Sequence, residues 1–434
     1  MIAGVFCLRK NPYSVRWCRF SSGERMPFLI SVTSGLPLES PNYWITAHRR
    51  ALGMQPNTLF NELRSLMHLY LWADLRGIDV SERLRDGVFL SLSEIIDLVG
   101  FCGRYLADIL PELEQRRSNV VALVNRRKRP KEDAVQSGEK RNRLTVIRGF
   151  LDFTSADHLS ELQKWPARWS VYDKMRRECL DRMGKYIGAI RAPNRDDVGQ
   201  KEGLDPEVVK RLLAIVEPDH PDNPFRPEVR FRNYLIVRLL IELGIRRGEL
   251  LGLYVVDMAL SGAKGTVTIH RRPDDKHDDR REKPAAKTAA RVLPLSGRAT
   301  ELLHEWVVEY RSKLPLARRN PFLIVTIPDG KPMSLSNINK IFQAIRKRVP
   351  GLPDELGPHL LRHSWNDAFS EQIDRKGNIS PENEIKWRKR LMGWRSDATA
   401  QHYLRRTTRR RSNEFLAEIQ EGLDIRMGDE GDDA

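Results

Sequence analysis

Apolar residues recur at three- and four-residue steps over most of the chain, which is the spacing of one face of an α-helix. The first clear helix begins near Asn57 or Thr58, either of which is a candidate N-cap, and ends at Gly77, a stop signal. Its apolar face comprises Leu59, Leu63, Leu66, Met67 and Tyr70. The same periodicity predicts further helices over residues 92–110, 143–153, 171–190, 206–216, 230–243, 298–310, 336–347, 358–369, 385–392 and 398–404.

Short alternating stretches interrupt this helical pattern in the second half of the chain. Residues 266–270 and 291–295 alternate between apolar and polar side chains. This is the period of a half-buried β-strand, and we expect the two segments to pair. Residues 322–325 form a further short apolar run, and no internal repeat is present. The sequence therefore predicts a mainly α fold with a small β-sheet.

Segments poor in apolar residues divide the chain into domains. Between the two helical regions lies a stretch that contains Pro, Gly and charged residues but almost nothing apolar, which is typical of a linker. Near the start, Met1 and Met26 are both candidate first residues. The predicted segments are an extended N-terminal arm (1–40), a helical domain (41–190), the linker (191–203), a second domain (204–412) and a C-terminal tail (413–434).

Charge points to the class of partner. The 434 residues include 74 Lys and Arg against 58 Asp and Glu, which gives a formal net charge of +16. Such a surplus suits a polyanion, because each neutralised phosphate releases condensed counterions. A hydrophobic content of 40% supports folded cores and excludes disorder throughout. Nucleic acid is therefore the leading candidate partner.

The cysteines and the apolar runs exclude several other classes of protein. The four Cys residues form no C-x-x-C pair, so a disulfide scaffold or zinc ribbon has no support. The best candidate for a membrane span, residues 234–245, is interrupted by Arg238 and Glu242. The apolar run at residues 2–8 precedes its positive charges, whereas a secretory signal has the reverse order. These features predict a protein of the reducing cytosol without a membrane partner.

Four short constellations in the second half carry candidate chemistry. The first is Arg246, which stands at the junction of two apolar helical runs, three residues before Glu249. By itself this arrangement favours a surface Arg–Glu pair along a helix. The second is Lys287, within Lys-Thr-Ala-Ala-Arg, directly before the strand predicted over 291–295. A lone Lys in such a turn is ordinarily just solvated.

The third constellation is His359-Leu-Leu-Arg362-His363, whose spacing places the three polar side chains on one face of a helix. Two histidines at i and i+4 also suit zinc. The zincin pattern, however, needs Glu directly after the first His, and Leu is found there. The fourth constellation is Trp394, followed nine residues later by Tyr403. Each of these aromatic residues alone would indicate a core or interface position.

In order and content, these constellations resemble the tyrosine recombinase (phage integrase) family. The catalytic domain of that family carries Arg, Lys, His-x-x-Arg, His or Trp, and then a nucleophilic Tyr. The matching residues here are Arg246, Lys287, His359, Arg362, Trp394 and Tyr403. The resemblance covers about residues 204–410, and residues 57–190 resemble the family's core-binding domain. It implies a two-lobed architecture, with a helical core-binding domain and an α-rich catalytic domain.

The sequence departs from the family pattern at three places. Trp394 stands where many members have His, so its implied role is hydrogen bonding and packing. Arg247 follows Arg246 where an aliphatic residue is common. A charged insertion, residues 271–286, replaces the usual tight turn before the catalytic Lys. Lys283 therefore stays an alternative to Lys287.

The resemblance implies phosphoryl transfer without a metal or other cofactor. Arg246 and Arg362 would hold the two non-bridging oxygens of a phosphodiester, because their planar guanidinium groups are permanently charged. Tyr403 would attack phosphorus and form a covalent phosphotyrosine. His359 would help to accept the tyrosine proton, and Lys287 would protonate the departing 5′-oxygen.

The implied function is site-specific recombination of double-stranded DNA through 3′-phosphotyrosyl links and a Holliday junction, as in integrases and transposon-type recombinases. The implied assembly is a homo-tetramer on paired sites in the cytoplasm, and accessory recombination proteins are left open. Residues 413–434 would occupy a groove of a neighbouring protomer, the alternative being packing on their own domain. Two other functions remain as alternatives: a catalytically idle DNA-binding regulator and a type IB topoisomerase-like enzyme that relaxes DNA.

Overall fold

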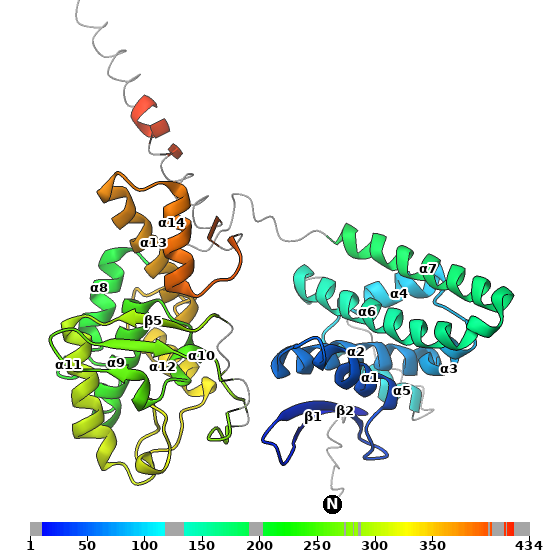
Figure 1. Cartoon of the computed structure of the whole chain (residues 1–434), viewed down its shortest axis with the longest axis horizontal. Helices are drawn as coiled ribbons and strands as arrows, with labels where there is room; N and C mark the ends of the chain where they lie inside the picture. Colours follow the sequence, from blue (N-terminus) through cyan, green and yellow to red (C-terminus); the bar gives the residue numbers. More distant parts are fainter. Residues whose placement is uncertain are drawn as a thin grey trace, which may run out of the picture. The chain divides into compact units, whose positions relative to one another are not determined.

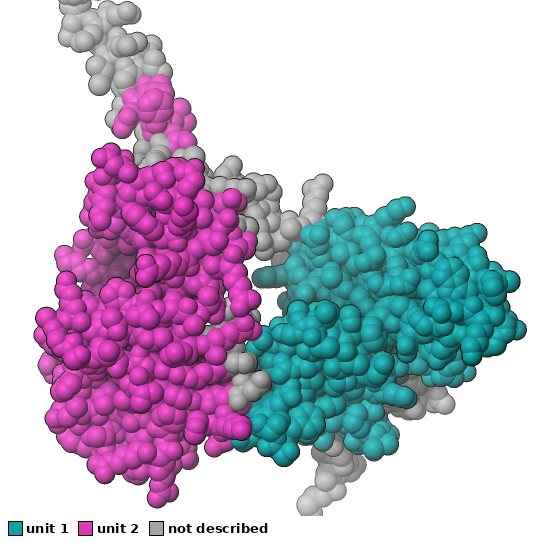
Figure 2. Space-filling view, viewed as in Figure 1, with its two compact units in different colours: residues 1–200 teal, residues 201–434 magenta. Residues whose placement is uncertain are grey.

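The computed structural model describes residues 11–117, 134–190, 203–272, 275–280, 282–284, 288–397, 400–401, 412–413 and 415–420. The chain forms two compact units, residues 1–200 and 201–434 (Figure 2). Each unit has a hydrophobic core of its own, and each is therefore described by itself. Within the described ranges, no helix is both long enough and apolar enough to cross a membrane.

The first unit combines a β-hairpin with a set of helices (Figure 1). Its central helix buries Leu59, Leu63 and Leu66 as the periodicity predicts, and it ends at Gly77 in the left-handed conformation. Short helical turns at Trp44–Arg50 and Leu162–Lys164 extend two of the helices. The elements are β1 (Tyr13–Arg19), β2 (Arg25–Ser31), α1 (Glu39–Tyr43), α2 (Pro56–Arg76), α3 (Val80–Arg85), α4 (Leu92–Phe101), α5 (Leu106–Arg117), α6 (Ser137–Glu161) and α7 (Pro166–Ala189).

The hairpin corrects the expectation of an extended arm over residues 1–40. Strands β1 and β2 pair antiparallel, and β2 packs on α2 with Met26 and Leu29 buried in the core of the unit. The side chain of Asn42 ties the hairpin to α1, because it accepts from the amide of Leu29 and donates to its carbonyl oxygen, both at 2.8 Å. Residues 13–31 are therefore part of the first core.

The helix predicted over residues 92–110 is divided in two. Helix α4 ends at Phe101 and α5 begins at Leu106. At the break, Nη1 of the buried Arg143 donates to the carbonyl oxygens of Cys102 and Arg104, at 3.1 and 2.9 Å. The guanidinium group comes from α6, far along the chain, and satisfies carbonyl groups that a continuous helix would have paired internally.

The second unit combines helices with a three-stranded antiparallel sheet of order β3-β4-β5. The predicted pairing of residues 266–270 with 291–295 is confirmed, with Val267 opposite Leu293. The described elements confirm a mainly α fold with small sheets. They are α8 (Pro206–Ile215), α9 (Pro227–Leu243), α10 (Arg247–Leu251), β3 (Met258–Ala259), β4 (Thr266–Ile269), β5 (Arg291–Pro294), α11 (Gly297–Glu305), α12 (Leu335–Arg348), α13 (Pro358–Lys376) and α14 (Pro381–Met392), with short helical turns at Val255–Asp257, Trp306–Tyr310, Arg311–Lys313 and Ala317–Arg319.

A left-handed turn fixes where α9 ends and α10 begins. Gly244 closes α9 with a φ of +57°. A Cβ atom on this residue would lie 2.6 Å from Cγ of Trp365, on α13. Trp365 also donates from Nε1 to the carbonyl oxygen of Glu242, at 2.9 Å. Helix α13 therefore packs directly against the turn, and the turn has no room for a side chain at residue 244.

We expect Gly244→Ala to destabilise the protein more than Gly377→Ala. Gly377 is the matched control, because it also ends a helix with positive φ (+73°), but a Cβ atom there would meet nothing within 4 Å. Backbone strain should cost about 1 kcal/mol in both variants. Overpacking against Trp365 should cost roughly 1–3 kcal/mol more in Gly244→Ala. Urea unfolding measures both free energies, and equal losses would contradict the close approach.

Candidate active site

The second unit brings three of the predicted site residues to one pocket. Arg246 is the N-cap of α10, whereas His359 and Arg362 lie in the first turns of α13. These residues, together with Arg247 and Pro358, line a pocket of about 410 Å³. The other predicted site residues are Trp394, which directly follows α14 and Gly393, and Lys287 and Tyr403, which lie outside the described residues.

Arg362 is buried and held in one orientation. Only 2% of its side chain is exposed. Its Nη1 donates to the carbonyl oxygen of Gly244 at 2.6 Å, and its Nη2 donates to that of Met392 at 3.3 Å. The guanidinium carbon also lies 5.5 Å from the ring centroid of Trp394. Arg362 therefore joins the turn after α9 to the end of α14.

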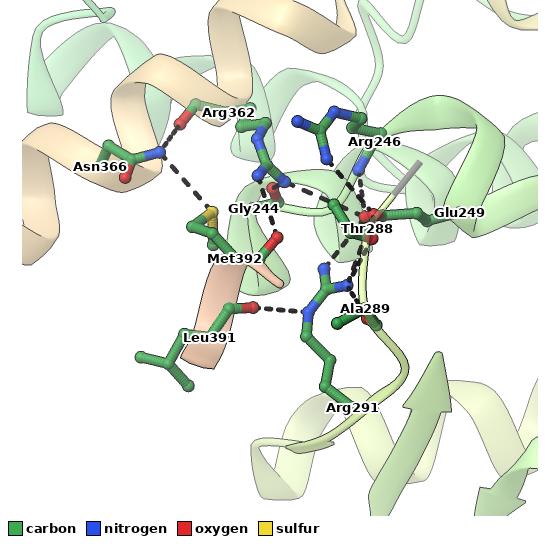
Figure 3. Close-up of polar contacts among 10 residues, drawn as sticks. All are labelled: Gly244, Arg246, Glu249, Thr288, Ala289, Arg291, Arg362, Asn366, Leu391 and Met392. Carbon is green, nitrogen blue, oxygen red and sulfur yellow. Dashed lines mark hydrogen bonds and ion pairs between the residues drawn. The ribbon is translucent and has the colours of Figure 1, made fainter. Parts of the chain in front are cut away.

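A single buried carboxylate lies among three arginines (Figure 3). The side chain of Glu249 is fully buried and accepts from Nη2 of Arg291 at 3.0 Å. Its Oε1 is 3.6 Å from Nη1 of Arg246, and its Oε2 is 3.9 Å from Nη1 of Arg362. The hydroxyl of Thr288 donates to the same carboxylate. The local sequence alone favours an exposed Arg246–Glu249 pair, and this interpretation is wrong because Glu249 is fully buried.

The surroundings keep Glu249 ionised. Burial alone would raise its pKa, but the charge of Arg291 and the hydrogen bonds from Arg291, Thr288 and the amide of Arg246 together hold this pKa below its ordinary value. The amide of Arg246 donates to Oε2 at 2.9 Å, so the carboxylate also closes the first turn of α10. The single negative charge of Glu249 therefore stabilises the positive charges of Arg246, Arg291 and Arg362.

The positive charge that remains faces the pocket. About a third of the Arg246 side chain is exposed, at 34%, and the residue lines the pocket, whereas its buried Nη1 lies on the Glu249 side and has no hydrogen-bond partner among the described residues. The neighbouring Arg247 also lines the pocket, and its Nη1 donates to Asn339 at 2.5 Å. A pocket with guanidinium donors and a net positive charge suits a tetrahedral or trigonal-bipyramidal oxyanion.

The two histidines of the third constellation lie side by side on α13. The ring centroids of His359 and His363 are 4.6 Å apart with the rings nearly perpendicular. His359 is exposed at the pocket, whereas His363 is buried. Among the residues that the structure describes, no group of three or more His, Cys, Asp or Glu side chains is placed to hold a metal ion.

The end of α14 is bound to the segment that follows Lys287. The carbonyl oxygen of Leu391 accepts from Nε of Arg291 at 2.6 Å, and that of Gly393 accepts from the amide of Ala289 at 3.0 Å. Between these two, the carbonyl oxygen of Met392 accepts from Arg362. Three successive carbonyl groups at this helix end therefore join β5, the preceding segment and α13.

The described part of the charged insertion is anchored rather than loose. Arg280 is buried, makes a two-pronged ion pair with Asp278, and donates to the carbonyl oxygens of Leu251 and Met333 at 3.1 and 2.8 Å. Nζ of Lys283 donates to the carbonyl oxygen of Asp275 at 2.7 Å. These residues of the insertion are therefore fixed to the body of the second unit.

Sequence reasoning missed the buried roles of Glu249, Thr288 and Arg291. One signal was present for Arg291. It shares a face of the predicted strand with Leu293 and Leu295, and all three side chains are buried. A charged residue on the apolar face of a strand needs a buried partner of opposite charge. The alternation therefore called for a carboxylate nearby, although it could not name Glu249.

Residues 202–410 match the model of the phage integrase family. The chain is 28% identical to the tyrosine recombinase XerC of Nitrobacter winogradskyi over 262 aligned residues. The aligned region covers 59% of this chain and 71% of that protein. Over 158 residues it is 25% identical to the tyrosine recombinase XerD of Halalkalibacterium halodurans, covering 36% of this chain and 46% of that protein.

Solved structures of recombinases are also similar to the chain. One is the Tn1549 transposon integrase in complex with transposon right end DNA, with 13% identity, a TM-score of 0.49, and coverage of 84% of this chain and 94% of that one. Another is the XerH site-specific recombinase bound to a palindromic difH substrate, with 19% identity, a TM-score of 0.41, and coverage of 82% and 94%.

Proposed function

We propose that this chain, which belongs to the phage integrase family of tyrosine recombinases, cuts and rejoins duplex DNA at specific sites through a 3′-phosphotyrosyl intermediate and a Holliday junction. One observation carries the proposal. Arg246 and Arg362 reach the same pocket, and the buried Glu249 lies behind both. Two guanidinium groups held in this way suit the non-bridging oxygens of a phosphodiester, on which negative charge grows in the transition state.

The remaining residues of the proposed site supply the nucleophile and the proton transfers. Tyr403 attacks phosphorus, so a phosphorus–oxygen bond to the tyrosine forms while the bond to the 5′-oxygen breaks. His359, exposed at the pocket, helps to accept the tyrosine proton. Lys287 gives a proton to the departing 5′-oxygen. Trp394, beside Arg362, contributes packing and hydrogen bonding. The covalent link retains the bond energy for rejoining.

The proposed partner is double-stranded DNA, and the net charge of +16 supports this choice. In the proposed assembly, four copies act on paired sites, residues 41–190 form the core-binding domain and residues 204–412 the catalytic domain. The tail, residues 413–434, is proposed to dock on a neighbouring copy. Cytoplasmic location is part of the same proposal.

Tyr403→Phe should bind DNA as the wild type does but form no covalent adduct, because only the hydroxyl group is removed. Tyr310→Phe is the control, since Tyr310 stacks on Phe231 away from the pocket. The measurement is the covalent protein–DNA complex on a nicked substrate in a denaturing gel. An adduct in Tyr403→Phe would identify another nucleophile. No adduct in the wild type would favour an idle DNA-binding regulator.

Lys287→Ala should cleave ordinary DNA roughly a hundredfold more slowly, the scale expected for losing a general acid. A substrate with sulfur in place of the bridging 5′-oxygen needs no proton from the enzyme, so its cleavage rate should recover towards that of the wild type. Lys283→Ala is the control, because Nζ of Lys283 already donates to Asp275. Sulfur rescue of Lys283→Ala alone would reverse the two assignments.

A further inference from the structure

All three guanidinium nitrogens of Arg291 donate hydrogen bonds, and these join separate parts of the proposed site. It begins β5, and only 4% of its side chain is exposed. Its Nε donates to the carbonyl oxygen of Leu391 at 2.6 Å, and its Nη2 donates to Glu249 at 3.0 Å. Its Nη1 donates to the hydroxyl of Thr288 at 3.0 Å and to Glu249 at 3.4 Å.

The end of α14 is shaped to receive this side chain. Gly393 has a φ of +67°, and a Cβ atom on it would lie 2.8 Å from both Nη1 of Arg291 and Cβ of Thr288. The amide of Ala289 also donates to the carbonyl oxygen of Gly393 at 3.0 Å. The glycine thus allows the segment 288–291 to approach the helix end closely, directly beside Trp394 in the sequence.

We propose that Arg291 is a positioning residue for strand cleavage, which holds Glu249 and the end of α14 in the geometry that presents Arg246 and Arg362 to the phosphate. The inference rests on the proposed function of this pocket. Arg291 itself does not line the cavity formed by Arg246, His359 and Arg362, so we expect it to act through its neighbours rather than by touching the phosphate.

The shape of the guanidinium group is central to this role. Its fork reaches the Glu249 carboxylate while Nε reaches Leu391, on the other side. A lysine ammonium group keeps the charge but concentrates its donors at one point, so it cannot serve both partners. Arg291→Lys should therefore stay folded and bind DNA normally, yet cleave roughly a hundredfold more slowly, as expected when reacting groups are misplaced.

Arg280→Lys is the matched control for a buried arginine in the same unit. Arg280 also forms a two-pronged pair with a buried carboxylate, that of Asp278, but its remaining donors bind the carbonyl oxygens of Leu251 and Met333. Thermal melting should show similar losses of stability in the two Lys variants. Only Arg291→Lys should lose cleavage of a nicked substrate.

The pH profile of cleavage separates positioning from a general loss of structure. Arg291→Gln removes the charge that holds the pKa of Glu249 low, so Glu249 should become protonated at a higher pH. The pH below which the cleavage rate falls should therefore be higher in Arg291→Gln than in the wild type, but unchanged in Arg291→Lys. Besides residue 291, the groups in contact with Glu249 are Arg246, Arg362 and Thr288. A small pocket beside Glu249 is also lined by His270, Arg272, Asp275, Asp278 and Arg280.

Thr288→Val is a milder variant that keeps Arg291 and its charge. It removes the hydroxyl that donates to Glu249 and accepts from Arg291, so cleavage should fall severalfold with unchanged DNA binding. Wild-type cleavage by Arg291→Lys, or equal loss in Arg280→Lys, would overturn the positioning role while leaving the proposed function intact. A wild-type protein that forms no covalent adduct would instead overturn the proposed function.

Discussion

The buried carboxylate of Glu249 is the interaction on which the second unit's pocket depends. Arg362 and Arg291 are exposed by only 2% and 4%, so both need a nearby negative charge. Removing two guanidinium groups from water is costly unless the charges are paired and hydrogen-bonded. Glu249 supplies this charge, and it also closes the first turn of α10 beneath Arg246. Four elements, α10, β5, α13 and α14, therefore meet around one side chain.

Two glycines let these elements come close enough. Gly244 ends α9 in a left-handed turn against Trp365, and Gly393 ends α14 against Arg291. At both positions a side chain would be strained by the backbone and would also collide with a neighbour. The carbonyl oxygens beside these turns then accept from Arg362 and Arg291. The arginines are consequently oriented before any ligand arrives, which is what electrostatic preorganisation requires.

Local periodicity predicted most of the helices and the β4–β5 pair, because these elements depend on side-chain spacing along one segment. It failed where a distant residue decides the outcome. Arg143 from α6 satisfies the break between α4 and α5, and Asn42 fixes the hairpin. The order of the motifs predicted that Arg246, His359 and Arg362 share a site, and they line one pocket. The roles of these residues, and of Lys287 and Tyr403, stay predictions.

The sequence did not predict that a buried carboxylate holds the arginines of the site. Locally, Glu249 has the spacing of a residue that pairs with Arg246 along a helix. Its burial depends on β5 and α13, which come later in the chain. The most direct test of the account is single-turnover cleavage of a nicked DNA substrate by Glu249→Gln, with Asp278→Asn as the control for a buried carboxylate paired with arginine. We expect Glu249→Gln to bind DNA normally but to cleave roughly a hundredfold more slowly, whereas Asp278→Asn should cleave nearly as the wild type does. Wild-type cleavage by a folded Glu249→Gln would contradict the account.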